Sequence, residues 1–230
     1  MSTARYILHY APDNASLVIR LALEELRLDY TTQLVDRQNS AQHSSAYRAL
    51  NPNQLIPVLE TPQGPIFETA AILLWLSDTH GHLGPGADDP QRAELLKWLF
   101  FLSNTLHPAL RMLFYPGAYI GRDVDHVSQL TQMTQSNILR LLGLIDQRWA
   151  DDRPGILLDL YLGPMMRWLA LYPTQSDRTW FDLTAFGAIH AALRNLEQRP
   201  SVETAQQAEG LGRDPFTSPR HPNPPEGSAT

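Results

Sequence analysis

The order of hydrophobic patterns in residues 5–35 constrains the fold of this chain most. The segment "RYILHY" is short and almost continuously apolar, as buried strands are. After the turn "APDN", Leu17, Val18 and Leu21 recur at helical spacing, and "DYTTQLV", from Asp29 to Val35, again has a strand pattern. The helix between the two segments supplies the length that a crossover between parallel strands needs. The sequence therefore predicts a β-α-β unit.

A hairpin and a second helix are predicted next. A short helix is expected from Ser44 to Leu50, and the segments "IPVLE" and "PIFE" flank the turn "TPQG", which favours an antiparallel hairpin. The segment "TAAILLWLSDTHG" is typical of a helix that ends at a glycine C-cap. A β-α-β unit followed by a β-β-α unit is the thioredoxin-like arrangement, which we assign to residues 1–81.

The remaining sequence predicts helices and no further strand. The segment "HGHLGPGADDP" is rich in Gly, Pro and Asp, so residues 82–90 are interpreted as a linker. Helices are expected from a cap at Asp89 to about Tyr115 and over residues 123–150, 157–172 and 178–198, which makes residues 91–212 an all-α domain. Prolines dominate the final segment, and residues 213–230 are therefore expected to form a disordered tail. The predicted fold class is α/β plus all-α.

Composition excludes several kinds of function. The 230 residues include no cysteine, so the chain has no thiolate to bind a metal, and no metal is expected. Any thiol chemistry would have to use a thiol from a ligand. A net charge of -6 without a basic cluster argues against nucleic acid or an anionic membrane as partner. The longest apolar run, Ala70 to Leu76, is too short to span a membrane, and no secretory leader is evident at the start. A cytoplasmic location is expected.

Several segments resemble the cytosolic glutathione transferases. The segment "NPNQLIPVLETPQGPIFETAAIL" is similar to their glutathione-binding segment, and "PDNASL" resembles the "PGACSL" turn of the bacterial beta class, with Ala15 in place of the cysteine. The segments "WLFFLSNTLH", "LGPMMRWLALYP" and "RPSVETA" resemble parts of the second domain. The resemblance spans residues 5–212. It implies a homodimeric detoxification enzyme that uses glutathione as co-substrate and transfers the thiolate to a hydrophobic electrophile.

The predicted glutathione-binding residues follow physical rules as well as the resemblance. A cis bond between Ile56 and Pro57 would turn the backbone of Ile56 outward, where it can pair with an extended peptide such as glutathione. Glu68 and Thr69 stand at a helix start that favours a carboxylate, and Glu68 can also bind the ligand's ammonium group. Taken alone, Pro57 is a simple edge-strand proline and Thr69 a helix cap.

One family feature is missing beside the Ile-Pro pair. Leu55 occupies the position of the usual Lys or Gln that meets the glycyl carboxylate, and Arg37 or Gln54 are expected to compensate. This departure predicts weak affinity for glutathione.

Three residues near the first helix are hypothesised to activate the glutathione thiol. Its free pKa is about 8.5, so a hydrogen-bond donor and a helix N-terminus are needed to stabilise the thiolate. Our order is Ser16, then Tyr10, then Asn14. The alternatives are that Ser16 and Asn14 only cap the helix and that Tyr10 packs in the core.

The second domain supplies further predicted site residues. The resemblance places Asn104 and His107 on the helix that faces the sulfur, although a lone histidine on an apolar helix is often structural. Phe114, Tyr115 and Tyr119 are candidates for the electrophile pocket, and helix core is the alternative.

Two other functions remain open at this point. One is a glutathione-dependent peroxidase or thiol reductase, and the other is a binding protein without turnover. Ile156 replaces the family's Ser/Thr helix cap and only Asp159 remains of that capping box, a loss that costs about 1 kcal/mol of folding stability.

Overall fold

The computed structural model describes residues 5–151 and 155–229. Its sheet has the strand order β2-β1-β3-β4. β1 (Tyr6–Tyr10) is parallel to β2 (Tyr30–Leu34) and antiparallel to β3 (Val58–Thr61), which forms a hairpin with β4 (Gly64–Phe67). α1 (Ser16–Glu25) makes the crossover. The predicted thioredoxin-like unit is confirmed.

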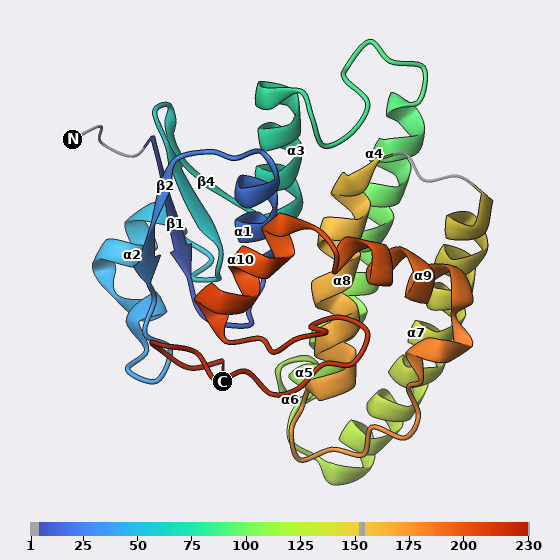
Figure 1. Cartoon of the computed structure of the whole chain (residues 1–230). Coiled ribbons are helices and arrows are strands. Elements are labelled where there is room, and N and C mark those ends of the chain that lie inside the picture. The colour runs from blue at the N-terminus through green and yellow to red at the C-terminus, as the bar shows by residue number, and fades with distance from the viewer. Residues whose placement is uncertain (1–4, 152–154, 230) are drawn as a thin grey trace.

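Helices cover both faces of this sheet (Figure 1), because successive side chains of each strand point to opposite faces. Tyr6, Leu8 and Tyr10 are buried in the same apolar cluster as α1 and α3 (Thr69–His80). On the other face the ring of His9 lies 5.9 Å from that of Tyr47 in α2 (Ser45–Leu50), which follows a 3₁₀ turn at Ala41–His43. α3 ends as predicted at Gly81, whose φ is 74°.

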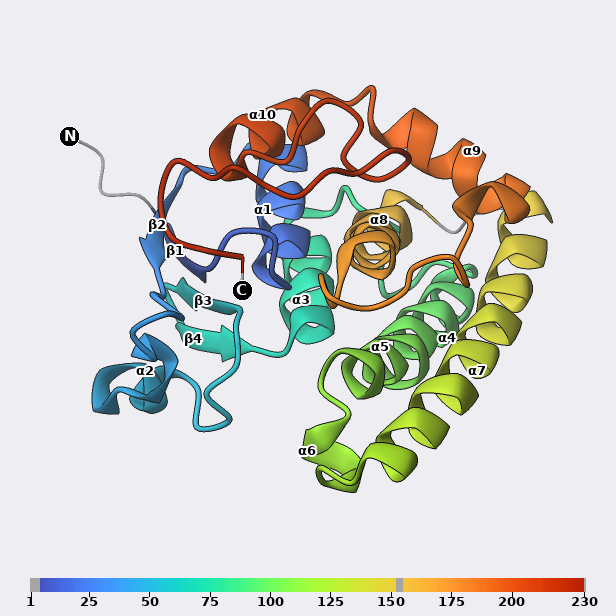
Figure 2. The same ribbon diagram turned by 90° about the horizontal axis from the view of Figure 1, so that it is seen from below.

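The second part of the chain is helical, as predicted, and packs around α8 (Figure 2). Its α-helices, in chain order, are α4 (Arg92–Phe101), α5 (His107–Phe114), α6 (Gly117–Ile120), α7 (Val124–Asp151), α8 (Ile156–Leu171), α9 (Gly187–Leu196) and α10 (Pro200–Glu209). A π-helical turn, Leu102–Leu106, joins α4 to α5, and a 3₁₀ turn covers Leu183–Ala185. None of the helices in the described residues is long and apolar enough to cross a membrane.

Two helix boundaries differ from the prediction. The expected helix over 178–198 begins only at Gly187, because the Asp182 carboxylate accepts hydrogen bonds from the N–H and the hydroxyl of Thr184 and holds a tighter turn there. The helix expected from Asp89 begins at Arg92, although Asp89 does accept from the N–H of Gln91 at 2.7 Å.

Two helices were not anticipated from the sequence. α6 is a single short turn, and α10 starts with Pro200 at its first position, a signal for helix starts. α10 packs against α1 and so joins the end of the helical part to the first domain.

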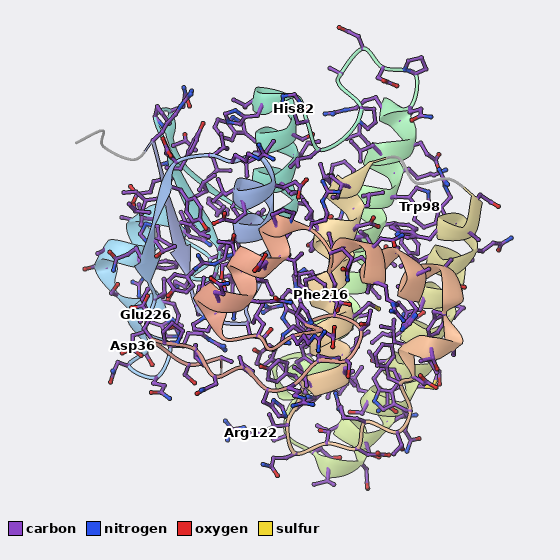
Figure 3. All side chains as sticks on the ribbon, in the orientation of Figure 1. Asp36, His82, Trp98, Arg122, Phe216 and Glu226 are labelled. Atoms are coloured by element: carbon purple, nitrogen blue, oxygen red, sulfur yellow. The ribbon has the colours of Figure 1, made fainter. Side chains whose placement is uncertain are left out.

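The largest correction concerns residues 213–229, which are not disordered. Phe216 is fully buried in the main apolar cluster, which extends without a break from β1 through α8. From there the chain runs across to the sheet, where Glu226 lies (Figure 3). The composition gave no sign of this packing, because the partners of the segment belong to distant parts of the sequence. The domain boundaries at residues 81 and 91 stay a prediction.

Candidate functional site

The three residues predicted to activate a thiol lie in or directly beside the turn between β1 and α1. Ser16 is fully buried, and its hydroxyl donates to the carbonyl of Ala11 at 3.1 Å and accepts from the N–H of Ala11 at 3.3 Å. A hydroxyl has one proton to donate, and this proton is used inside the turn. The cap residue of α1 is Ala15, without a side-chain hydrogen bond, so Ser16 closes the turn and does not cap the helix.

Tyr10 is also occupied. Its side chain is buried, the guanidinium carbon of Arg20 lies 4.7 Å from the ring centroid, and its hydroxyl donates to the carboxylate of Glu226. Burial, together with this hydrogen bond to Glu226, raises the pKa of Tyr10 above its ordinary value. Tyr10 therefore packs as a core residue whose hydroxyl is bound by Glu226.

Asn14 is the one residue of the three that is partly exposed. Its Oδ1 accepts from the N–H of Ala15 at 2.8 Å, and no described residue accepts a hydrogen bond from its amide nitrogen. Within residues 5–151 and 155–229, the backbone N–H of Ser16 has no acceptor either. The start of α1 thus presents an amide group and a backbone donor.

The bend before β3 has the predicted cis bond between Ile56 and Pro57. The carbonyl of Leu55 accepts from the Tyr47 hydroxyl at 2.9 Å and from the Asn51 amide at 2.7 Å. By contrast, no hydrogen bond between described residues uses the backbone N–H or carbonyl of Ile56. The bend therefore offers one unpaired donor and one unpaired acceptor to an extended peptide. The sequence motif did not reveal the roles of Tyr47 and Asn51.

The start of α3 has free backbone donors as well. Glu68 precedes the helix with a φ of 72°, its side chain is exposed, and Thr69 is buried. The N–H of Ile72 donates to the Glu68 carbonyl at 3.0 Å, whereas the N–H groups of the three preceding residues find no acceptor in the described part of the chain. These donors and the positive end of the helix dipole suit a carboxylate.

Arg37 connects the sheet domain to the predicted electrophile pocket. Its Nη1 donates to the carbonyl of Ala229 at 2.7 Å and its Nη2 donates to the hydroxyl of Tyr115 at 3.5 Å. Tyr115 and Tyr119 are exposed and Phe114 is half-buried. The structure therefore brings Arg37 and Tyr115 together. Elsewhere on the first domain, Gln54 bonds to the ring of His43, with 2.7 Å between Oε1 and Nδ1.

His107 faces buried aromatic residues of α8. Its Nδ1 lies 2.8 Å from the hydroxyl of Tyr161, and its ring centroid is 5.7 Å from that of Trp168. Burial, with a smaller effect of the Arg111 charge, lowers the pKa of His107 to about 4, so the ring is neutral at pH 7. Asn104 is exposed and accepts from the Ser103 hydroxyl at 3.0 Å.

Tyr161 and Trp168 were missed as site neighbours. Burial and the Glu68 charge raise the pKa of Tyr161. Trp168 lies in "LGPMMRWLALYP" and Tyr161 directly precedes it, and the sequence pattern of this segment predicts no site residue.

Comparisons with known proteins agree with this geometry. A family model described as "Glutathione S-transferase, N-terminal domain" matches residues 15–79. Glutathione S-transferase GST-4.5 from Xanthomonas campestris is 28% identical over 210 residues, which cover 89% of this chain and 98% of that protein. A solved beta class glutathione S-transferase from Sphingomonas chungbukensis is 27% identical, with a TM-score of 0.73, and the match covers 90% of this chain and 100% of that chain. Over most of its length the chain is therefore similar in sequence and fold to glutathione transferases.

Two further similar proteins carry information about ligands and chemistry. A glutathione transferase from Burkholderia graminis, solved with two glutathione molecules bound per subunit, has a TM-score of 0.76 and is 26% identical, with coverage of 91% and 90%. The disulfide-bond oxidoreductase YfcG from Escherichia coli is 25% identical over 214 residues, covering 89% of this chain and 96% of that protein.

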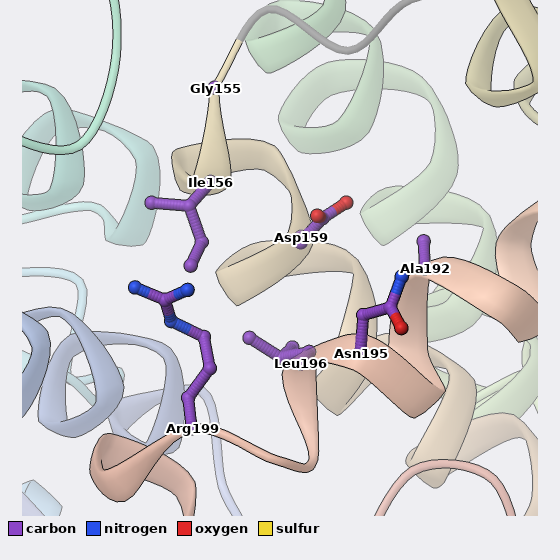
Figure 4. A pocket seen from close by; sticks show the side chains of 7 residues that line it. All are labelled: Gly155, Ile156, Asp159, Ala192, Asn195, Leu196 and Arg199. Carbon is purple, nitrogen blue, oxygen red and sulfur yellow. The ribbon is translucent and has the colours of Figure 1, made fainter.

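The capping box that the resemblance implies is altered at the start of α8. Ile156 follows Gly155, which makes no side-chain cap, and the Asp159 carboxylate accepts from Trp149 Nε1 at 2.8 Å. A cavity of about 260 Å³ opens beside it (Figure 4). Its lining comes from the starts and ends of helices in the second part of the chain, namely Gly155, Ile156, Asp159, Ala192, Asn195, Leu196 and Arg199. No residue predicted to bind glutathione lines this cavity.

Proposed function

We propose that the protein binds glutathione across the Ile56 bend and the starts of α3 and α1, and directs its thiolate at a hydrophobic electrophile. The proposal rests on the unpaired backbone groups at Ile56 and at Thr69 to Ala71, which lie beside segments whose polar groups are satisfied. A peptide backbone matches the first set, and a carboxylate matches the second. Glu68 then binds the ammonium group next to that carboxylate.

Asn14 is proposed as the side-chain donor to the thiolate. Ser16 and Tyr10 already donate their hydroxyl protons within the protein, whereas the Asn14 amide has no acceptor among the described residues. Lowering the thiol pKa by one unit requires about 1.4 kcal/mol of preferential stabilisation of the anion. An amide hydrogen bond together with the N-terminus of α1 can supply this amount.

The conjugation step itself requires no protein nucleophile. The thiolate sulfur forms a bond to an electrophilic carbon, and the leaving group departs with the electron pair of the bond that breaks. Phe114, Tyr115 and Tyr119 are proposed to provide the apolar wall, which lies beside Arg37 through the contact with Tyr115. Dimerisation and a cytoplasmic location belong to the same proposal.

A second candidate function is reduction of disulfides by glutathione. The specific observation in its favour is the similarity to a protein named a disulfide-bond oxidoreductase, combined with the absence of cysteine in this chain. In such a reaction one glutathione thiolate attacks a disulfide, and a mixed disulfide and a thiolate result. A second glutathione then attacks the mixed disulfide, which yields glutathione disulfide and the second thiol.

Calorimetry followed by thiolate titration tests the proposal. Glutathione is titrated into the full chain, and the absorbance of the bound thiolate is then followed against pH. We expect Asn14→Ala to raise the pKa of the bound thiol by about one unit. Tyr10→Phe, in the preceding strand, is the control and should leave this pKa unchanged. Absence of binding heat at millimolar glutathione would refute both enzymatic functions.

Product analysis separates the two reactions. The protein is incubated with glutathione and either an activated aryl halide or a small disulfide. Formation of a thioether supports conjugation, and formation of glutathione disulfide supports reduction. If glutathione binds and neither product forms above the uncatalysed rate, the protein is a binding protein and both catalytic proposals are wrong.

A further inference from the structure

Arg167 joins three parts of the chain that are far apart in sequence. It lies in α8, has no solvent exposure, and donates from Nε to the Asp13 carboxylate at 2.8 Å. Its Nη1 donates to the carbonyls of Leu211 and Pro215, each at 3.2 Å, and its Nη2 donates to the carbonyl of Arg220 at 2.9 Å. One guanidinium therefore links the β1–α1 turn to α8 and to residues 211–220, here named the C-terminal segment.

Asp13 bonds to several other residues besides Arg167. Its carboxylate also accepts from Trp168 Nε1 at 3.1 Å and from the Tyr172 hydroxyl at 2.7 Å, and its backbone N–H donates to the carboxylate of Glu209 at 2.8 Å. Its φ is 50°, a left-handed conformation that aspartate adopts more readily than most residues other than glycine. The contacts with α8, Tyr172 and α10 hold the turn in this conformation.

Asp13 is followed directly by Asn14 and Ala15, where the thiolate is proposed to lie. A shift of the Asp13 backbone moves the Asn14 amide and the first N–H groups of α1 with it. Hydrogen-bond donors stabilise a developing charge only when they are held in place before the reaction. The position of the donors in the first domain thus depends on a side chain of the second part.

We propose that Arg167 is a positioning residue, which fixes the thiolate-binding turn by bonding Asp13 to the C-terminal segment. This inference rests on the proposed function, because it concerns the thiolate of bound glutathione. Arg167 acts through Asp13 and contacts no reacting atom.

The geometry requires arginine at this position. A guanidinium has five N–H donors on three nitrogens, and these reach a carboxylate and three carbonyls in different directions. Lysine carries the same charge on one nitrogen and reaches only part of this set. Loss of the guanidinium leaves the Asp13 carboxylate without its ion-pair partner and the three carbonyls of the C-terminal segment unsatisfied, so both segments must shift.

The matched control is the ion pair between Arg92 and Asp78. Arg92 donates to both carboxylate oxygens of Asp78 at 2.7 Å and to the carbonyl of Pro85 at 3.0 Å. This pair ties the start of α4 to α3 and touches neither the turn nor the C-terminal segment. Arg92→Met therefore removes an arginine with similar bonding but without a link to the thiolate site.

Two measurements on the 230-residue protein test the inference. The first is the pKa of the thiol of bound glutathione, read from thiolate absorbance in wild type, Arg167→Lys, Arg167→Met and Arg92→Met. We expect both Arg167 variants to raise this pKa by about one unit, since the donors at α1 are displaced. Arg92→Met should keep the wild-type value. KM for glutathione should change by less than about threefold in Arg167→Lys, because the Ile56 bend and the start of α3 stay intact.

The second measurement is amide hydrogen exchange of residues 13–17 without glutathione. We expect exchange to be faster in Arg167→Lys and unchanged in Arg92→Met. If Arg167→Met does not fold, Asp13→Asn replaces it, since this variant breaks the same ion pair. A wild-type thiol pKa in folded Arg167→Lys overturns the inference, as does an equal shift in Arg92→Met. Absence of glutathione binding by the wild-type protein overturns the proposed function, and unchanged exchange in Arg167→Lys then overturns the positioning role separately.

Discussion

Replacing Phe216 by alanine should destabilise the protein by about 4 kcal/mol. The side chain has no solvent exposure, and removal of a fully buried phenyl ring costs about 3–5 kcal/mol. The low end of this range is not expected because the ring is tightly enclosed: a Cβ added at Gly163 of α8 would lie 3.3 Å from Cγ and Cδ1 of Phe216 and 3.2 Å from Leu196 Cδ2. Such surroundings have little freedom to collapse into the cavity left behind.

A second substitution makes this prediction specific to the contact. Gly163→Ala alone should gain about 1 kcal/mol of helix propensity and lose a similar or larger amount through crowding against Phe216. In the Phe216→Ala background the crowding is relieved, so the same substitution should stabilise the protein by about 1 kcal/mol. The two sites should therefore couple in a double-mutant cycle.

Urea unfolding of the four proteins measures these free energies. The control is Phe100→Ala on α4, where the ring is 49% exposed and the cost should stay below about 1 kcal/mol. If Phe216→Ala costs no more than Phe100→Ala, the C-terminal segment does not pack as described, and the role assigned to Arg167 loses its support as well.

Two further predictions concern acid stability and ligand binding. The folded pKa of His107 is about 4 and its ordinary value is 6.5, so the unfolded chain takes up the proton first as the pH falls. The contribution of this group to stability is therefore complete above pH 6.5 and is lost as the pH falls toward 4. The wild type should lose about 3 kcal/mol more than His107→Gln between pH 7 and pH 4 in urea unfolding, and an equal loss in both proteins would contradict a ring that stays neutral in the folded state. Thr69→Val should weaken glutathione binding by about 1 kcal/mol, a factor of roughly five in the Kd measured by calorimetry, since it removes a hydroxyl at the start of α3. Thr79 is exposed in the same helix, and Thr79→Val should leave the Kd unchanged. Equal affinities for both variants would remove Thr69 from the site.

Much of the first domain could be predicted from the sequence because its signals are local. The apolar spacing of α1, the "TPQG" turn of the hairpin and the glycine that ends α3 each specify structure within a few residues. The Ile56-Pro57 bend could be located in the same way, since an X-Pro bond and the residues around it are adjacent in the chain. Helix starts that depend on side-chain bonds, such as the one delayed to Gly187, were predicted less well.

The order among the three thiolate candidates could not be obtained from the sequence. Ser16 ranked first there because it matches the serine that follows the cysteine in the "PGACSL" turn of the beta class, but in the fold its hydroxyl donates to the carbonyl of Ala11. Tyr10 is bound by Glu226, a residue 216 positions away. Asn14 is proposed as the donor because the hydroxyls of Ser16 and Tyr10 already donate within the protein.

The sequence by itself determined the fold class, the resemblance to glutathione transferases and the requirement that any thiol come from a ligand, since a chain without cysteine has none to offer. Only the tertiary structure decided which donors at α1 are free, and that the proline-rich end of the chain is folded. The physical reason is that the buried Arg167 guanidinium binds three backbone carbonyls of that segment and that Phe216 is buried next to Gly163 of α8. A local pattern contains no information about partners that lie some fifty residues away in sequence and are brought near only by packing.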